Sequence, residues 1–196
     1  MPKVPVVPSL KIRDIEKKAN EVSYGYSASW NGLEPVPVDL IFDYDIKHLG
    51  VRTLYTNLLA QGISAYGYTD GINKISMIDE AVANNYTVAG RRFFRSTAGH
   101  ESGHCFLHVP YGAIHASLQS QGYNFKRDRS NLKPWEDPEW QAWRFCKALC
   151  MPEHLVRALV RKYDTKKSGI LVMVEAFDMS FSFVQGRLRD LKLLPR

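Results

Sequence analysis

The chain has little cysteine and no long hydrophobic run. Its 196 residues include three cysteines, an odd number that excludes a fully paired disulfide framework and favours a reducing compartment. The longest apolar run, ILVMV at 170–174, is far shorter than the roughly 20 apolar residues of a membrane-spanning helix. Prolines interrupt the N-terminal sequence MPKVPVVPS, where a signal peptide needs an unbroken apolar helix. We therefore expect a cytoplasmic protein with no membrane partner.

Internal repeats are also absent from the sequence, and the only biased segment is the proline-rich N-terminus. Hydrophobic residues make up 45% and charged residues 23% of the chain, which are ordinary values for a globular protein. The net charge of +6 comes mainly from residues 99–196, which hold 15 Lys and Arg against 10 Asp and Glu. Such an excess can attract nucleic acid or another acidic partner, but it more often marks a solvated helix face.

Capping and periodicity predict helices in the first 50 residues. Ser9 is a suitable N-cap for a helix whose apolar residues recur at helical spacing, namely Ile12, Ile15, Ala19 and Val22. Asp39 is the predicted N-cap of a second helix, LIFDYDIKHL. We expect this helix to end at Gly50, because glycine readily takes the positive φ of a helix C-terminus.

The next segment predicts a small antiparallel sheet. VRTLY, directly after Gly50, has the composition of a strand. Asp70 and Gly71 form a dipeptide suited to a two-residue hairpin turn, and they stand between ISAYGYT and INKISMI. We therefore expect residues 63–78 to form two antiparallel strands.

Helices are predicted for most of the remaining chain. AGRRFFRSTAGHESGHCFLH has no proline and repeats its apolar residues at helical spacing until Val109 and Pro110. Asp137 and Pro138 form a good helix start, and that helix should reach Cys150. Pro152 opens another helix, and two short amphipathic segments then follow, the second with Ser180 as its N-cap.

These elements together predict an α+β fold. A small antiparallel sheet would pack against the long helix predicted at residues 89–108, and a helix-turn-helix-like region would follow. The predicted boundaries are residues 1–152 for a core domain and residues 153–196 for a C-terminal helical subdomain.

The HExxH motif is formed by His100, Glu101 and His104. Residues four apart lie on one helix face, about 6 Å apart along the axis, so both imidazoles can reach one ion. Glu101 projects about 100° around the helix, where it can reach a water in an open coordination position rather than the metal itself. This is the arrangement of two zinc ligands and a general base.

His108 is not expected to be the third ligand, because it lies about 12 Å along the axis from His100. We expect it to close the helix as a buried or supporting histidine. The downstream candidates are Glu136, Glu139, His115 and His154. Glu139 is favoured because it heads an otherwise apolar helix stripe that must pack inward, and a carboxylate there needs a partner. Glu136 remains an alternative, since it precedes that helix directly.

A cysteine-based metal site is the rival interpretation. Cys146 and Cys150 are one turn apart, and Cys105 adjoins His104. However, the chain has no CxxC spacing, and Cys105 should point about 100° away from the histidine face. We therefore interpret all three cysteines as small apolar core residues.

Four ordered segments of the chain resemble the ImmA/IrrE-type metallopeptidase family. RRFFRSTAGHESGHCFLH is similar to the HExxH segment of that family, and EWQAWRFCKALCMP is similar to the segment that begins with its glutamate ligand. PVDLIFDYDIKHLGV resembles its N-terminal segment, and EAFDMSFSFVQGRLRDLKLL its closing segment. The resemblance covers residues 37–194. Departures at Gly99, Ser102, Cys146 and Cys150 remove neither a ligand nor the base.

The resemblance implies that residues 1–152 form a zinc metallopeptidase core in which a small sheet packs against a zincin-like HExxH helix. It also implies a gluzincin-like endopeptidase with His100, His104 and Glu139 as ligands. Zinc is the implied cofactor, with manganese or iron in the same ligand set left open. The implied partner is a protein substrate, a helix-turn-helix repressor or antitoxin whose cleavage turns on stress, phage or mobile-element genes. The substrate would lie along the sheet, with INKISMI as a candidate edge strand. The candidates for an oxyanion donor are Tyr111, Tyr123 and His115.

Two other functions compete with the peptidase. In a DNA-binding regulator, residues 170–194 would read DNA around a structural zinc site, with phosphates bound by Arg187, Arg189 and Lys192. Against this, the last helix carries apolar residues that should pack it onto the body, namely Phe183, Val184, Leu188 and Leu191, and a structural zinc site normally has four protein ligands. An interaction module with a vestigial site would hold no metal.

Overall fold

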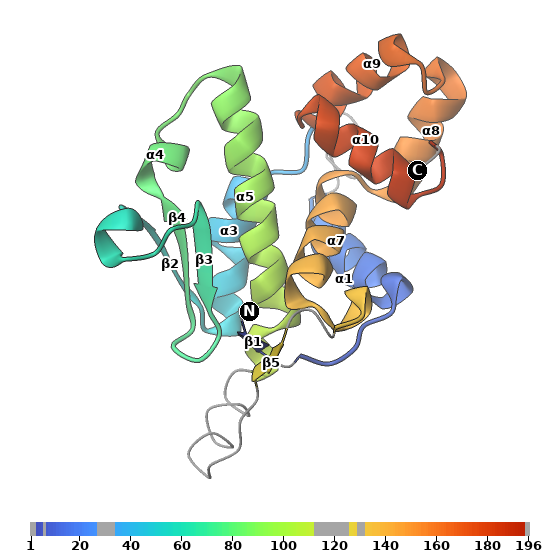
Figure 1. The fold of residues 1–196 in the computed structure, drawn as a ribbon. Helices are drawn as coiled ribbons and strands as arrows, with labels where there is room; N and C mark the ends of the chain where they lie inside the picture. Colours follow the sequence, from blue (N-terminus) through green and yellow to red (C-terminus); the bar gives the residue numbers. More distant parts are fainter. Residues whose placement is uncertain (1–2, 6, 27–33, 112–125, 129–131, 195–196) are drawn as a thin grey trace.

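The computed structural model describes residues 3–5, 7–26, 34–111, 126–128 and 132–194 (Figure 1). Its helices are α1 (Ile12–Tyr24), α3 (Val38–Asp43), α4 (Glu80–Ala83), α5 (Val88–Leu107), α7 (Pro138–Cys150), α8 (Glu153–Tyr163), α9 (Lys167–Phe177) and α10 (Phe181–Asp190). Short 3-10 helices are η1 (Asp45–Leu49), η2 (Leu59–Gln61) and η4 (Pro134–Glu136). The strands are β1 (Lys3–Pro5), β2 (Arg52–Thr56), β3 (Gly67–Asp70), β4 (Ile75–Asp79) and β5 (Lys126–Asp128). The predicted mixed α+β class, with a small sheet and C-terminal helices, is confirmed.

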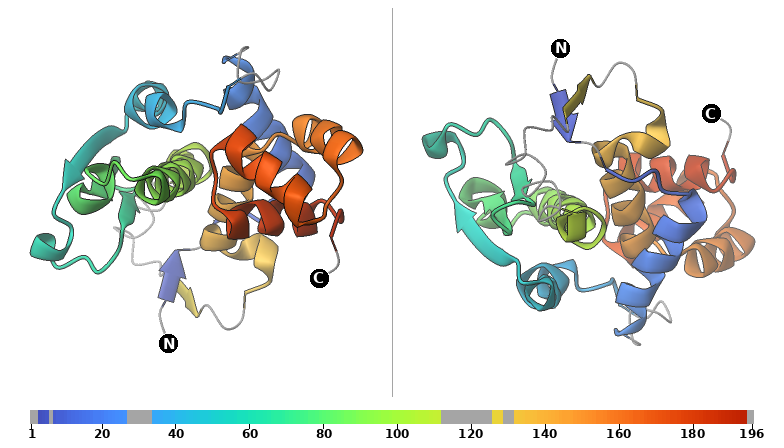
Figure 2. Two further views of the ribbon diagram at one scale, coloured as in Figure 1. Left: turned by 90° about the horizontal axis from the view of Figure 1, so that it is seen from above. Right: turned by 90° about the horizontal axis from the view of Figure 1, so that it is seen from below.

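Helix α5 occupies the centre of the molecule. The sheet of β2, β3 and β4 lies on one side of α5 and α7 lies on the other, with α1 packed against α7 (Figure 1). Seen along its axis, α5 is enclosed between these two layers (Figure 2). A single apolar cluster runs from Ile15 of α1 through Phe145 of α7 to Leu188 of α10. The C-terminal helices thus share their core with the rest of the chain, and a domain boundary after residue 152 stays a prediction.

The three-stranded sheet is mixed, so the prediction of an antiparallel sheet is wrong in part. The strand order is β2-β4-β3, with β4 antiparallel to β3 but parallel to β2. The connection after β2 carries the chain to the far edge, and the hairpin then returns β4 beside β2 in the same direction. INKISMI therefore supplies the central strand, and the prediction that it is an edge strand is also wrong.

The hairpin turn is longer than predicted. Register pairs Asp70 with Ile75, which leaves four residues, 71–74, in the turn instead of two. The Asp70 carboxylate accepts hydrogen bonds from the backbone N–H groups of Ile72 and Asn73, both at 2.9 Å. Such a side chain mimics a backbone turn and stabilises the wider loop, and Lys74 closes it with a φ of 52°.

Two predicted N-caps are wrong, and the others are confirmed. Helix α1 begins after Lys11 rather than Ser9, and α3 begins after Pro37, which places Asp39 in the first turn. The second predicted helix is also divided into α3 and η1, although Gly50 ends it with a φ of 74° as expected. Asp137 caps α7 and Ser180 caps α10, each through its side chain.

Helices α9 and α10 form a bent pair whose second member is packed onto the body. Within the described residues, no single helix has the length and apolarity to cross a membrane. Among these residues, only α9 and α10 taken together have that length and apolarity, and they are bent by 104° relative to each other. Phe183, Val184 and Leu188 are buried as expected. Arg187 is fully buried as well, donates to the Met151 carbonyl at 3.0 Å and pairs with Glu16. The prediction that Arg187 contacts DNA phosphates is therefore wrong.

Helices α5 and α7 approach each other closely along two glycines. A Cβ at Gly103 would lie 2.9 Å from the backbone oxygen of Ala142, and one at Gly99 would lie 2.8 Å from the Cys146 sulfur. Side-chain carbons do not normally come this close to such atoms, so the two helices pack at this distance only because both positions lack a Cβ. The glycine at position 99 is thus explained by its contact with Cys146.

Gly103→Ala should force α5 and α7 apart. Overpacking a core contact costs about 1–3 kcal/mol, so we expect the free energy of unfolding in urea to fall by that amount. Gly25→Ala is the matched control, because a Cβ there meets only the Val22 oxygen at 3.5 Å, an ordinary contact. Equal stability of the two variants would contradict the close-packing account.

Candidate metal centre

Three predicted ligands converge between α5 and α7. The Nε2 atoms of His100 and His104 are 3.1 Å apart, and Glu139 places Oε2 at 3.2 Å from the first and Oε1 at 3.3 Å from the second. In a tetrahedral zinc site with bonds of about 2.0–2.1 Å, ligand atoms lie about 3.3–3.4 Å apart. The observed spacing fits a divalent cation held by these three side chains, which form the metal-competent cluster found among the described residues.

Glu139 reaches the histidines from the first turn of α7. Asp137 caps this helix by accepting a hydrogen bond from the Glu139 N–H at 3.0 Å, and Pro138 occupies the first helical position. Hydrogen bonds with His100 and His104 hold the pKa of the Glu139 carboxyl well below its ordinary value, so the ligand is ionised. Its side chain is 40% exposed, which leaves the centre open to solvent on this side.

A chain of hydrogen bonds fixes the proton on His104. Gln141 is fully buried and its Nε2 donates to the carbonyls of Pro8 at 2.9 Å and Trp135 at 2.8 Å. Its Oε1 must therefore accept, and it takes the Nε2 proton of His108 at 2.9 Å. His108 Nδ1 then accepts from His104 Nδ1 at 3.0 Å. Because Nδ1 carries this proton, the Nε2 of His104 can give its lone pair to a metal ion in place of its hydrogen bond to Glu139.

His108 thus supports a ligand instead of being one. It is the C-cap residue of α5, where it was expected to close the helix. Burial lowers its pKa to about 3, helped by the neighbouring charge of His104. A ring that stays neutral can accept the hydrogen bond from His104 Nδ1 at any pH near neutrality.

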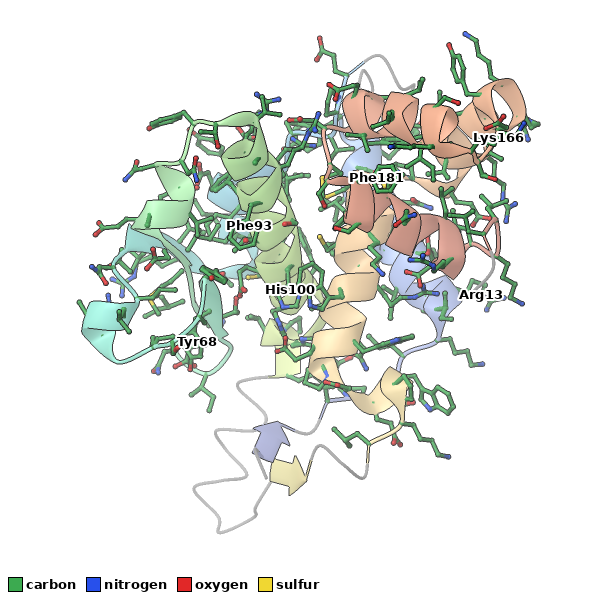
Figure 3. The ribbon with its side chains drawn as sticks, turned by 45° about the horizontal axis from the view of Figure 1, so that its top comes forward. Arg13, Tyr68, Phe93, His100, Lys166 and Phe181 are labelled. Carbon is green, nitrogen blue, oxygen red and sulfur yellow. The ribbon has the colours of Figure 1, made fainter. Side chains whose placement is uncertain are left out.

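His100 is held by packing more than by hydrogen bonds. The Trp143 ring lies 4.4 Å from the His100 ring, centroid to centroid, and His100 projects from α5 into the space between α5 and α7 (Figure 3). Its Nδ1 is buried and has no hydrogen-bond partner among the residues that the structure describes. Helix packing around Gly99 and the Trp143 contact therefore orient this ligand.

Glu101 lies on the sheet side of α5, against β3. Only 4% of the residue is exposed. Thr69 donates a hydrogen bond to its Oε2 at 2.6 Å, and a Cβ on Gly67 would come within 2.6 Å of its Oε1. Burial raises the pKa of Glu101 to about 6, against the opposing effects of His104 and of the Thr69 hydrogen bond. A carboxylate with such a pKa can both accept and return a proton near neutral pH.

The remaining candidates do not join the centre. Glu136 accepts a hydrogen bond from the Lys133 N–H at 3.1 Å, and His154 lies on α8; neither belongs to the ligand cluster. His115 and Tyr123 lie outside the described residues. Tyr111 lies just after α5, where its N–H donates to the His108 carbonyl. The three cysteines are free and buried, as expected.

Sequence reasoning missed Thr69 and Gln141. Gln141 shares a helix face with Phe145, Ala148 and Leu149, all buried, so a polar residue within this apolar stripe was a usable signal, like the one that singled out Glu139. Thr69 gave no comparable signal. Its role depends on where β3 lies relative to α5, and no local pattern encodes this.

Gln141→Leu should weaken the binding of a divalent cation, with zinc as the probe, because His108 loses its acceptor and the proton on His104 is no longer fixed. Loss of such a supporting hydrogen bond typically costs about 10–100-fold in metal affinity, which a competition titration against a chromophoric chelator measures. Gln61→Leu, at an exposed glutamine of η2, is the control. A folded Gln141→Leu chain that binds zinc as tightly as the control would disprove this role.

No protein-family model matches this chain, and no curated protein matches it. The description of the centre therefore depends on the residues themselves. Two imidazoles from one turn of α5 and a carboxylate from the start of α7 form a ligand set that can hold a divalent cation, and a second, buried carboxylate lies beside the first histidine in the sequence.

Proposed function

We propose that this chain is a zinc-dependent endopeptidase of the zincin type, similar to the ImmA/IrrE-type metallopeptidases. The observation that carries the proposal is the arrangement of the two carboxylates. Glu139 is ionised and completes the His100 and His104 ligand set, whereas Glu101 is buried about 100° farther around α5, against β3, with a pKa raised to about 6. Glu139 would bind the metal and Glu101 would act as the general base, because their environments shift the pKa values of the two carboxyls in opposite directions.

A divalent cation bound by the three ligands would polarise the scissile carbonyl and make the attacking water more acidic. The Thr69 hydrogen bond occupies Oε2 of Glu101, which leaves Oε1 to accept the proton of that water. Glu101 then transfers the proton to the leaving amine nitrogen as the C–N bond breaks. Gly67 provides the space in which Oε1 lies.

The substrate segment is proposed to bind in extended form along β3. Strand β4 pairs on both sides, with β2 and β3, so it has no free edge to offer. Strand β3 is an edge strand and carries Gly67 and Thr69 beside Glu101. A peptide that adds to this edge would pass next to the proposed base. From the family resemblance, we propose a helix-turn-helix repressor or antitoxin in the cytoplasm as the substrate.

Glu101→Gln should abolish cleavage but keep the metal. The amide cannot accept the water proton, and loss of a general base typically costs about 10²–10⁴-fold in rate. The test is cleavage of a helix-turn-helix repressor encoded beside this gene, followed by gel electrophoresis, with bound zinc measured in parallel. Glu80→Gln, at an exposed position of α4, is the control. Full cleavage by Glu101→Gln would rule out the proposal, and tight binding to duplex DNA without cleavage would favour the regulator.

Gly67→Ala should reduce cleavage while leaving zinc bound. The added Cβ would stand 2.6 Å from Oε1 of Glu101, so the carboxylate must move away from the position where it accepts a proton. Gly71→Ala, in the turn of the same hairpin, is the matched control, because a Cβ there meets its nearest neighbour at 3.8 Å. The expected kinetic signature is a loss of at least about tenfold in kcat/KM, and equal rates for both variants would contradict it.

A further inference from the structure

A cleft lies apart from the metal centre, where the start of α1, η4, the middle of α7 and the end of α10 meet. Its volume is about 770 Å³, within the range of about 300–1,000 Å³ typical of small-molecule sites. Its apolar wall consists of Leu10, Ile12, Pro134, Trp135 and Trp140. Arg13, labelled in Figure 3, follows Ile12 and marks this side of the molecule. None of the metal-centre side chains lines the cleft.

The rest of the lining is strongly basic. Lys11, Arg189 and Lys192 stand at exposed positions of the lining, and none of them has a carboxylate partner in the part of the chain that the structure describes. Asp190 is the acidic residue of the lining, and it is already shared: its Oδ2 lies 2.6 Å from Arg144 Nη1 and 3.0 Å from Lys147 Nζ. One carboxylate between two cations leaves excess positive charge beside the cleft.

Arg144 is the feature that points to a ligand. It is 8% exposed, lines the cleft, and has a buried Nε with no hydrogen-bond acceptor among the described residues. Its guanidinium carbon lies 5.5 Å from the centroid of the Trp140 ring. A buried cation with an incomplete set of acceptors is costly, and a bound anion offsets that cost. Next to an aromatic face, the guanidinium also favours a flat ligand.

We propose that this cleft binds a small organic anion with a flat apolar body and one carboxylate, sulfonate or phosphate group. The apolar body would lie against Trp135 and Trp140, and the charged group would be attracted to Arg144 and to the cations at the exposed positions. Few converging polar groups on a mainly apolar wall are typical of small-molecule sites. The proposal is independent of the peptidase activity, because it needs neither the metal nor Glu101.

The test uses the full chain and two probes of similar shape. We expect 8-anilinonaphthalene-1-sulfonate, which carries one fixed negative charge, to bind at one saturable site with a rise in fluorescence. N-phenyl-1-naphthylamine, which lacks the sulfonate, should bind at least about tenfold more weakly, since a charged hydrogen bond or ion pair contributes at least about that factor. Equal affinity for the two probes would overturn the proposal.

Variants locate the probe. Trp135→Ala, at a side chain 46% exposed, and the double variant Arg189→Gln/Lys192→Gln, at exposed positions, should each weaken sulfonate binding several-fold without loss of fold. Arg144→Met should weaken it further and leave the uncharged probe unaffected. Controls are Arg13→Gln, whose side chain is 88% exposed and outside the lining, and Tyr86→Ala, which is 85% exposed.

Two outcomes would overturn the assignment. The first is sulfonate binding that neither Trp135→Ala nor the double variant reduces relative to the controls. The second is a single-stranded oligonucleotide that binds in a way that depends on the same residues while the sulfonate does not bind, since this would make the cleft a nucleic-acid site. Native circular dichroism of every variant separates lost binding from lost folding.

Discussion

The close approach of α5 and α7 is the constraint on which the rest of the structure depends. One turn of α5 supplies two of the ligands, His100 and His104, and a site of this kind needs a third. That third ligand must come from another helix that lies close by. Gly103 allows the Ala142 backbone to lie against α5, and this contact places Glu139, three residues earlier, opposite the histidine pair. The metal centre is thus a consequence of helix packing more than of the HExxH motif alone.

The position of α5 is fixed at its N-terminal end by a second set of contacts. Arg91 binds the Asp178 carboxylate with two hydrogen bonds, of 2.6 and 2.9 Å, and Arg92 reaches both Asp178 and Glu175. Arg95 is buried and donates to the backbone carbonyl of Asp178 at 3.1 Å. These arginines tie the helix that carries the ligands to the turn between α9 and α10. Two of the acidic residues of the C-terminal half, Glu175 and Asp178, are therefore already paired with arginines from the first half of the chain, which net charge alone cannot reveal.

Local signals in the sequence were sufficient for the long helices α5 and α7 and for the three side chains that converge between them. The extent of α7, its Asp137 cap and the inward face of Glu139 followed from capping and periodicity, which act within a few residues. The order of the strands did not, because the hairpin pattern is the same whether β3 or β4 pairs with β2. Likewise, the Asp70 carboxylate stabilises a wider turn by accepting hydrogen bonds from two backbone N–H groups. The Asp70-Gly71 dipeptide alone does not show that this wider turn is favoured over a two-residue turn.

Helix α7 also explains how one short segment can serve two separate sites. Successive helical residues point about 100° apart, so Glu139 faces the metal centre, Trp140 the basic cleft and Gln141 the buried hydrogen-bond chain. Trp135 joins these regions, since its side chain lines the cleft and its carbonyl accepts from Gln141. The Gln141 amide, which orients His104 through His108, is therefore held by the backbone at Trp135, the residue that also lines the cleft. A substitution that moves the backbone at Trp135 must act on both sites, whereas one that changes only the Trp135 ring acts on the cleft alone.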